Sequence, residues 1–574
     1  MRSRRQSLVR RSLRSALFGA VAAGIALSVL YLAGSRLPFP LVDLILLAAL
    51  YSAIVSSHRR SLIECAMVGG TLGIPIWAVS LPLIGGRGMA LDAETMRSNF
   101  MFLIAWVLFG IVFGTLLELL QRLAHIILGN DEESFADTTP AGKRIVVLGG
   151  GFAGMGTAEH LEALLKSTPS ASITLVSETN ALLFTPMLAE VAGGSLEPTH
   201  ISTPIRSGLQ RTEFIRARVA GVDPTNHQIT LEERESPDGS PRAASLPYDY
   251  LVIAVGSVPN FLGMDNVQKL ALNFRSLIDA SHIRNRVIEK FELADKQPIR
   301  RERQKMLRFV IAGGGYAGVE LAGAMNDLAR GILINYPNIQ PDEVEVMLVH
   351  SRDRILPELT ETLAVYALKR MEERGVVFRL NTRVKDATPS TVVLGDGTVE
   401  AQTLIWTAGS APNDLLKSLP FATDKRGALL VEPTLTVLDQ DDVWALGDCA
   451  AASDSLSGLP CPPTAQFAIR EAKTVAKNVC LKMKGLQQSP FHFRSLGSLC
   501  VVGHQTACAE LALPFGSSKS IKFSGLAAWL MWRLIYLSKL PGSERKVRVL
   551  LDWVLELFFP RDIVQTHDIR EARP

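Results

Sequence analysis

The sequence predicts an α/β protein in which a strand, a glycine-rich turn and a helix occur twice along the chain. Three observations support this prediction: the repeated turn, an apolar surplus concentrated in the first quarter of the chain, and two apolar or amphipathic segments near its end. At 574 residues, 48% of them hydrophobic, the chain is too long for one core. We therefore expect two or three domains and contact with a membrane.

Charge and cysteine content exclude several classes of function. The 60 basic and 56 acidic side chains leave a net charge of +4, which is too balanced for an electrostatic nucleic-acid binder. The six cysteines contain no C-x-x-C or C-x4-C pair, so neither a disulfide framework nor a zinc site is indicated. We expect no metal, no nucleic-acid partner and a reducing compartment.

Four apolar stretches predict a transmembrane region over residues 1–124, followed by a polar linker over 125–142. Each stretch has close to the ~20 residues that cross a hydrocarbon core as a helix; they cover 15–34, 38–57, 62–86 and 99–124. Arginines precede the first stretch and a His-Arg-Arg sequence joins the second to the third, which predicts cytoplasmic termini. A twin-arginine export signal is the alternative, but no small-residue cleavage site closes the first stretch. The predicted location is the inner (plasma) membrane, multi-pass, with the catalytic domain facing the cytoplasm.

The first glycine turn follows a predicted strand in "KRIVVLGGGFAGMGTAEHL". Gly149, Gly151 and Gly154 have G-x-G-x-x-G spacing, in which the first makes the turn, the second admits a pyrophosphate and the third lets the helix meet the strand. The helix N-terminus offers unpaired N–H groups to the phosphate. The next strand ends at Glu178, which fits the ribose-binding acid of this fingerprint.

The second glycine turn repeats the pattern in "MLRFVIAGGGYAGVELAGAMNDL", with Gly313, Gly315 and Gly318 at the same spacing. Its second strand, in "VEVMLVHSRDR", ends at His350. Two such turns predict two adenine dinucleotides whose reactive rings are brought together. The alternative is that the glycines only tighten two empty Rossmann-like domains.

From Lys143 to its end the chain resembles type II NADH dehydrogenases, single-subunit FAD-dependent NAD(P)H:quinone oxidoreductases of the two-dinucleotide-binding-domain flavoproteins. The motifs that carry the resemblance are "LLFTPMLAEVAGGSLEP", "YDYLVIAVGSVPNFLGM", "TLIWTAGSAPN", "VWALGDCAA" and "PPTAQFAIREAKTVA". They are similar to a flavin-side loop, two crossings between domains, a second flavin contact and a segment beside the flavin ring at the quinone pocket. The cofactor-binding residues that the resemblance implies are Thr185, Gly256, Gly447, Asp448 and Ala465.

The predicted architecture is therefore α/β, with two Rossmann-like dinucleotide-binding domains, four N-terminal transmembrane helices and C-terminal membrane-associated helices. Its parts after the linker are a FAD-binding domain in two pieces, an NAD(P)H-binding domain between them and a C-terminal membrane-association region. Their predicted limits are 143–265 and 396–480, 266–395, and 481–574, respectively.

The resemblance implies that NAD(P)H gives hydride to FAD and that both electrons then pass to a membrane quinone. Glu320 matches the family position between nicotinamide and quinone, where a buried carboxylate relays a proton; the alternative is an acid in the first helical turn that complements the helix dipole. Gln466 either bonds a quinone carbonyl or caps the pyrimidine edge of the flavin. Proton pumping is not expected, because the three acids of the predicted spans lie near helix ends and form no relay; these are Asp43, Glu64 and Glu118.

Related enzymes that use paired thiols are disfavoured. Disulfide reductases and sulfide:quinone reductases need such a pair beside the flavin, and no cysteine occurs between Ala66 and Asp448.

Three positions depart from the family pattern. Ser177 stands where Asp is common, so Glu178 lies one residue beyond the usual acid and could point away from the ribose of FAD; Glu178 is kept as the predicted contact. Arg470 and Ala472 replace a common glutamine and glycine, which leaves the acceptor open. His350 replaces the Glu of NADH-specific members, and with Arg352 nearby this predicts a shift toward NADPH or dual use. The alternative is that Arg352 is a solvated charge and His350 only packs on adenine.

Two C-terminal segments, "FSGLAAWLMWRLIYLSKLPG" and "RKVRVLLDWVLELFFPRD", predict helices that lie in the membrane interface. A buried homodimer contact is the alternative reading of these segments, and the two are compatible. The expected partners are thus a membrane quinone and the lipid bilayer. Two other functions stay open: a FAD/NAD(P)H oxidoreductase with a non-quinone acceptor, and a nucleotide-binding redox sensor in the membrane.

Overall fold

The computed structural model describes residues 107–116, 119, 142–166, 168, 171–232, 243–493, 495–512 and 520–565. The first three predicted spans and most of the fourth lie outside these residues, so the four-helix region stays a prediction. Residues 107–116 form a helix. Across the described part of the chain, no helix is both long and apolar enough to span a bilayer. The chain divides into two compact units, Met1–Ser134 with Arg533–Phe559 and Phe135–Trp532 with Pro560–Pro574.

Within the second unit, the first domain is built on a five-stranded sheet in the order β20-β9-β1-β2-β5, all parallel. Its inner strands are buried almost throughout, as expected when helices cover both faces of a parallel sheet. Helix α6 (Phe152–Leu164) packs against α14 (Ala465–Met483). The strands are β1 (Arg144–Leu148), β2 (Ser172–Ser177), β5 (Glu213–Arg216), β9 (Tyr250–Ile253) and β20 (Val443–Ala445).

The second domain repeats this plan with a parallel sheet in the order β11-β18-β12-β13-β14. Its strands are β11 (Leu272–Asn273), β12 (Arg308–Ala312), β13 (Glu345–Val349), β14 (Val376–Arg379) and β18 (Thr403–Trp406). Its helices are α10 (Leu277–Asp295), α11 (Arg300–Met306), α12 (Tyr316–Ile332) and α13 (Glu361–Glu373). The predicted end of this domain at residue 395 is wrong, because β18 follows that residue and pairs with β12.

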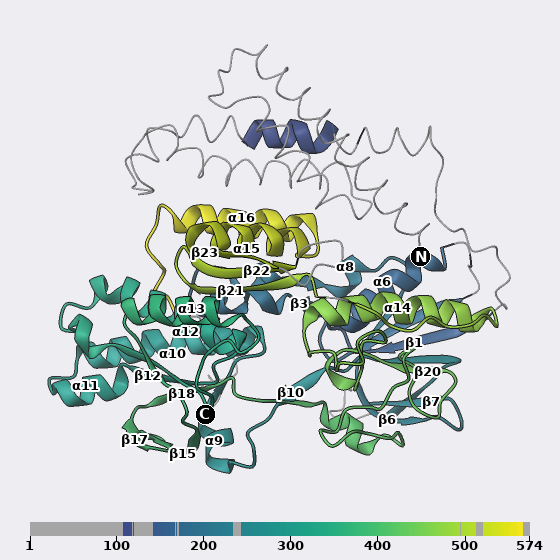
Figure 1. Cartoon of the computed structure of the whole chain (residues 1–574), viewed down its shortest axis with the longest axis horizontal. Helices are drawn as coiled ribbons and strands as arrows, with labels where there is room; N and C mark the ends of the chain where they lie inside the picture. The colour runs from purple at the N-terminus through teal and green to yellow at the C-terminus, as the bar shows by residue number, and fades with distance from the viewer. Residues whose placement is uncertain are drawn as a thin grey trace, which may run out of the picture. The chain divides into compact units, whose positions relative to one another are not determined.

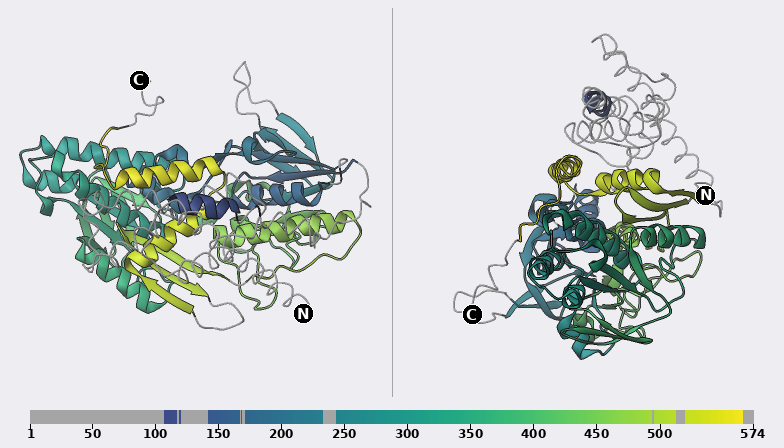
Figure 2. Two further views of the ribbon diagram at one scale, coloured as in Figure 1. Left: turned by 90° about the horizontal axis from the view of Figure 1, so that it is seen from above. Right: turned by 90° about the vertical axis from the view of Figure 1, so that its left-hand side faces the viewer.

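Two antiparallel strands, β10 (Ser257–Pro259) and β19 (Ser410–Pro412), connect the two domains. Figure 1 shows β10 running between them, and the view from above separates the teal second domain from the blue and light-green first domain (Figure 2). Each domain also carries a three-stranded antiparallel sheet. These are β6 (Arg218–Asp223), β7 (Gln228–Glu232) and β8 (Ala243–Pro247) in the first, and β15 (Val384–Thr388), β16 (Thr391–Leu394) and β17 (Gly397–Glu400) in the second.

Short elements complete the first domain and its exit. A two-stranded antiparallel sheet and short helices follow β2, and a six-residue helix precedes the second domain. They are β3 (Ala181–Leu183), α7 (Leu188–Ala192), β4 (Ser202–Pro204), α8 (Ile205–Gly208) and α9 (Asp265–Leu270).

The C-terminal region begins with an antiparallel sheet that the sequence analysis did not predict. Its strands are β21 (Gly497–Gly503), β22 (Thr506–Ala512) and β23 (Ser520–Ser524), followed by α15 (Gly525–Lys539) and α16 (Ser543–Glu556). The start of α15 packs on this sheet through Ala528 and Trp529. Large apolar side chains stay exposed on and after α16, as a membrane-interface helix would require; they are Leu551, Leu555, Phe558 and Phe559.

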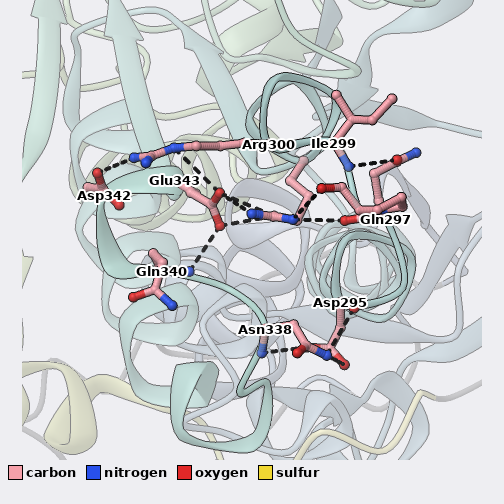
Figure 3. A network of polar contacts seen from close by, with 10 residues as sticks. Asp295, Gln297, Ile299, Arg300, Asn338, Gln340, Asp342 and Glu343 are labelled. Atoms are coloured by element: carbon pink, nitrogen blue, oxygen red, sulfur yellow. Dashed lines mark hydrogen bonds and ion pairs between the residues drawn. The ribbon is translucent and has the colours of Figure 1, made fainter.

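A buried carboxylate holds the amino-terminal edge of the second sheet. Glu343 accepts hydrogen bonds from Arg303 Nη2 at 2.7 Å and from Gln340 N at 3.0 Å, while Arg300 pairs with both Glu343 and Asp342 (Figure 3). Burial alone would raise the pKa of Glu343, but hydrogen bonds from Arg303 and Gln340 N, with the charges of Arg303 and Arg300, hold it below its ordinary value. This network lies at the opposite ends of β12 and β13 from the glycine turn, so its role is structural.

Candidate functional site

The first glycine of each turn requires a backbone that only glycine adopts easily. Gly149 has φ +109° and Gly313 has φ +119°. A Cβ on Gly149 would lie 2.2 Å from Ala254 O, and one on Gly313 would lie 2.6 Å from Thr407 Oγ1. Ala254 directly follows β9, which pairs with β1, and Thr407 directly follows β18, which pairs with β12. Any side chain on the first glycine would therefore push the turn away from the end of the neighbouring strand.

The backbone at the second and third glycines is compatible with the roles that the spacing predicted. A Cβ on Gly151 or Gly315 would meet nothing within 4 Å, and each residue precedes its helix without a side-chain cap. A Cβ on Gly154 or Gly318 would lie 1.8 or 1.9 Å from the carbonyl oxygen of the first glycine. Both turns therefore leave open backbone at an uncapped helix N-terminus, which fits the pyrophosphate of a dinucleotide.

The strand ends beside the two turns can be aligned by their hydrogen bonds. Gly149 N donates to Val176 O at 2.8 Å, and Gly313 N donates to Val349 O at 2.9 Å. The residue after each valine is thus equivalent, which matches Ser177 to His350. A Cβ on Gly150 or Gly314, the residue after the first glycine of each turn, would meet these side chains, at 2.7 Å from Ser177 Oγ and 2.6 Å from His350 Cγ.

Glu178 lies one residue beyond this position. Its carboxylate is about half exposed and lies 3.7 Å from Arg218 Nε in a surface ion pair. The register therefore brings Ser177, and not Glu178, to the place that His350 holds in the second turn. Glu178 as the ribose contact stays a prediction.

His350 is held under the second turn as a neutral imidazole. Gly314 N donates to His350 Nδ1 at 3.1 Å, which leaves the hydrogen on Nε2. Within the described residues, the buried Nε2 atom has no hydrogen-bond partner. Burial, and then the charge of Arg352, lowers the pKa of His350. The position that holds a carboxylate in NADH-specific members is here a neutral donor.

Arginines surround this strand end. Arg352 is exposed, and no hydrogen bond or ion pair joins its side chain to another described residue. Arg379 ends β14, its carbonyl oxygen accepts from His350 N at 2.8 Å, and its guanidinium lies 4.0 Å from Asp396. Two cations with little or no pairing thus lie at the carboxyl edge of the second sheet.

Asp448 lies in a turn that is held from two sides. Gly447 has φ +73°, and its N–H donates to Glu471 Oε2 at 2.7 Å. Asp448 Oδ2 accepts from Ser257 Oγ at 2.6 Å, and Ser257 Oγ in turn accepts from Arg275 Nη2 at 3.0 Å. Burial, opposed by the Gly447 N–H and assisted by Asp448, raises the pKa of Glu471 to about 7.

Glu320 is a half-buried residue between α12 and the C-terminal region, and its carboxyl is poorly solvated. Val501 N donates to its Oε1 at 3.3 Å, and Glu190 and Trp532 lie close to it. Burial, with a smaller contribution from Glu190, raises its pKa to about 8. The prediction that Glu320 lies in the first turn of its helix is wrong, because it is the fifth residue of α12, whose first turn has no acid.

Gln466 is bonded to the chain segment before β21. Its Oε1 accepts from Leu496 N at 2.8 Å, and its Nε2 donates to Gly497 O at 3.2 Å. The amide therefore links the start of α14 to the C-terminal sheet. Each role predicted for Gln466 would need the remaining hydrogen or lone pair of this amide, and both stay predictions.

The other predicted contacts lie on loops and helix starts around the first turn. Thr185 is exposed at the start of a short 3-10 helix, and Ala465 is the first residue of α14. Gly256 has φ +70° and its carbonyl oxygen accepts from Asn413 N on the return crossing. Arg470, the departure in α14, lies with its guanidinium carbon 5.3 Å from the ring centroid of Phe493.

Sequence reasoning missed the residues that hold the predicted ones. Ser257 and Arg275 hold Asp448, Glu471 holds Gly447, and Trp532 lies beside Glu320. These partners come from segments far apart in the chain, and only the position of Ser257, directly after Gly256, was a local signal.

Two family models match the chain. The model described as pyridine nucleotide-disulphide oxidoreductase covers residues 143–472, and the one described as NDH2 C-terminal domain covers residues 495–562. The first spans both sheets and both glycine turns, and the second covers the C-terminal sheet with α15 and α16.

Relatives are similar over most of their own length. A probable NADH dehydrogenase of Dictyostelium discoideum is 30% identical over 73% of this chain and 91% of the relative. A type II NADH:quinone oxidoreductase of Mycobacterium tuberculosis is 29% identical over 74% and 89%. Among solved structures, NDH2 of Plasmodium falciparum in complex with NADH matches with a TM-score of 0.66 and 19% identity, over 74% of this chain and 99% of that one.

Proposed function

Because the chain belongs to the type II NADH dehydrogenase family, we propose that it oxidises NAD(P)H with FAD and reduces a membrane quinone, without pumping protons. Membership of the family supports an enzyme of the NADH:quinone oxidoreductase type with FAD and NADH as cofactors. We propose in addition that the quinone is taken from the membrane and that no protons are pumped.

The observation that carries the proposal is the pair of open glycine turns in one compact unit, joined by β10 and β19. Gly151 and Gly315 leave room for two pyrophosphates. The buried atoms Arg275 Nη1 and His350 Nε2 each lack a partner among the described residues, so the Ser257–Asp448 contact and the second glycine turn each have a donor that a bound dinucleotide can satisfy. Bound FAD would supply two-electron chemistry, taking hydride from the reduced nicotinamide and passing the electrons to quinone.

Glu320 is the residue we assign to proton supply. Its pKa of about 8 keeps the carboxyl largely protonated at neutral pH, and Val501 N–H orients one oxygen, so the proton is held at the other. Reduction of a quinone to a quinol consumes two protons. A neutral buried acid carries no charge before the reaction, can deliver one of these protons, and then takes up a proton again to return from carboxylate to acid.

Stopped-flow reduction of the purified protein by NADH, followed by reoxidation with a short-chain quinone, tests the proposal. We expect fast bleaching of the flavin absorbance and recovery when quinone is added. Fast reduction without recovery would refute the quinone as acceptor. Flavin reduction by NADH that is too slow to support catalytic turnover would favour the nucleotide sensor.

We further propose that the enzyme uses NADPH at least as well as NADH. The neutral His350 neither bonds both ribose hydroxyls as a carboxylate does nor repels a 2'-phosphate, and Arg352 and Arg379 offer two cations at the same sheet edge. The ratio of kcat/KM for NADPH and NADH measures this directly. A ratio well below one would refute it.

Membrane attachment is also part of the proposal. The exposed apolar residues on and after α16, and the predicted spans over residues 15–124, support it. A carbonate wash of isolated membranes should leave the protein in the pellet, and release into the supernatant would refute the transmembrane part. The homodimer stays a prediction.

A further inference from the structure

We propose that Arg275 positions FAD: it reaches from the second domain into the first, holds Asp448 through Ser257, and donates its remaining N–H groups to an oxygen of the bound dinucleotide. The inference rests on the proposed flavin chemistry, and it assigns a role to a residue that no motif of the sequence analysis included.

The bridge is a continuous chain of hydrogen bonds. Arg275 Nη2 donates to Ser257 Oγ at 3.0 Å, and Ser257 Oγ donates to Asp448 Oδ2 at 2.6 Å. Ser257 lies on β10, whose pairing with β19 joins the two domains. Through Ser257, a cation from the second domain therefore orients one carboxylate oxygen of Asp448.

The backbone of Arg275 is fixed by the helix that follows it. Ser276 caps α10 with a reciprocal pair of hydrogen bonds to Asp279, and Asp279 Oδ2 also accepts from Arg275 N at 3.0 Å. The side chain thus starts from a rigid point. Its planar fork can serve Ser257 with one nitrogen and a second acceptor with the other, which the single ammonium of a lysine would not do with the same geometry.

The second nitrogen is the observation that points to a ligand. Arg275 Nη1 is buried and has no hydrogen-bond partner within the described residues. Leaving a buried charged donor unpaired is costly, so folded proteins rarely keep one without an acceptor. Burial, only partly offset by Asp448 and Asp279, lowers the pKa of this guanidinium, in keeping with its limited access to water.

The chemistry of the missing partner follows from that of arginine. A guanidinium only donates, so the partner is an acceptor, and a negatively charged or carbonyl oxygen would satisfy it best. FAD carries phosphate, ribityl and ring carbonyl oxygens, and Arg275 acts at the turn of Gly447 and Asp448 that resembles a flavin contact. NAD(P)H also carries phosphate oxygens, and the experiment separates the two.

The test is titration of the apoprotein with FAD, followed by absorbance and flavin fluorescence. We expect Arg275→Met to raise the Kd for FAD about tenfold to a hundredfold, the range for a lost hydrogen bond to a charged group. Arg275→Lys keeps the charge and should give an intermediate loss. The Kd for NADH, measured on the FAD-loaded protein, should change by less than threefold.

Arg308→Met is the matched control, because Arg308 is a part-buried arginine that pairs with Glu345 at 2.9 Å in the same domain. It should lower the melting temperature of the apoprotein without changing the Kd for FAD. A merely structural Arg275 would give this same pattern and overturn the inference.

The remaining outcomes are also decisive. An unchanged Kd for FAD in Arg275→Met overturns the inference, as does a selective loss of NADH binding. If Arg275→Met does not fold, Arg275→Lys decides in the same way. A wild-type protein that never retains flavin would refute the proposed function itself, before any variant is made.

Discussion

The two glycine turns share one backbone and differ in the residues around it. In each turn the first glycine has a positive φ, and the third would place a Cβ under 2 Å from the carbonyl oxygen of the first. At the fifth position of the helix, however, the first turn has Gly156 and the second has Glu320. A glycine lets α6 approach α14 through Ala472, whereas the carboxyl is buried near Val501 of β21.

The residues at the two strand ends also differ in size, with the smaller residue again in the first turn. The small Ser177 lies beside Gly150 of the first turn, and the ring of His350 lies beside Gly314 of the second. The spacing of glycines thus encodes the capacity to hold a dinucleotide. What is bound and what reaction follows depend on the neighbouring positions, where the two turns do not match.

The largest expected effect comes from the third glycine of each turn. Gly154→Ala should abolish FAD retention, and Gly318→Ala should leave the flavin bound but abolish its reduction by NADH, because each Cβ would overlap a backbone oxygen at 1.8 or 1.9 Å. Flavin absorbance of the purified variants, then stopped-flow reduction, measures both. Gly221→Ala is the control, since its Cβ would meet nothing within 4 Å. Loss of flavin in both variants would show that the turns do not bind separate ligands.

The second expected effect concerns Glu320, which has no counterpart in the first turn. Glu320→Gln should slow flavin reoxidation by quinone about a hundredfold, within the usual range for general acid catalysis, and leave reduction by NADH unchanged. In the wild type, reoxidation should slow as the pH rises through about 8, where Glu320 loses its proton. The variant should lack this titration. Glu361→Gln, at an exposed acid of α13, is the control.

Stability provides an independent check on the same group. The folded pKa of Glu320, about 8, lies above the ordinary 4.5, so its contribution to stability is fully present below 4.5 and is lost as the pH rises through 8. Urea unfolding should show the wild type losing stability over this window relative to Glu320→Gln. Parallel curves for the two proteins would show that the carboxyl is not buried as described.

Much of the fold and part of the site could be predicted from the sequence, because local patterns encode them. Glycine spacing and buried strands predicted both sheets, whereas Asp448 and Glu320 were singled out by the family resemblance and their roles stay predictions. The predicted end of the second domain, at residue 395, comes before β18, which pairs with β12 of that domain. The sequence of β18 is a short apolar run that carries no signal for which sheet it joins. Arg275 and Trp532 were missed because their partners are set by tertiary contacts.

The amino-terminal edge of the second sheet gives a contrast with the glycine turn at its other end. Glu343→Gln should lower the free energy of unfolding by about 3 kcal/mol, because it leaves Arg303 without its buried counter-charge, while Arg300 keeps Asp342. It should not change the ratio of kcat/KM for NADPH and NADH. Because the folded pKa of Glu343 is lowered, the wild type loses this stability as the pH falls below the ordinary value of 4.5 and through the lowered one. A variant as stable as the wild type at neutral pH would contradict the network.

The strand-end comparison predicts a smaller change in cofactor preference. His350→Glu should shift the ratio of kcat/KM toward NADH by about tenfold to a hundredfold, since the carboxylate would bond ribose hydroxyls and repel a 2'-phosphate. Arg352→Ala combined with Arg379→Ala should shift it in the same direction by lowering kcat/KM for NADPH alone. If the double variant loses activity with both cofactors equally, the arginines do not select the 2'-phosphate.

The smallest expected effect is at Glu178, where two explanations of the first turn separate. The register places Ser177 at the position of His350, and Glu178 is a half-exposed acid 3.7 Å from Arg218. Exposed pairs of this kind contribute about 0 to 1 kcal/mol, so Glu178→Gln should change the Kd for FAD by less than about fivefold. A loss of tenfold or more would mean that the acid bonds the ribose, as the sequence alone suggested. In that case the residues that contact the ribose would differ by one position between the two turns. The equivalence of Ser177 and His350 would then hold for the backbone but not for the binding site.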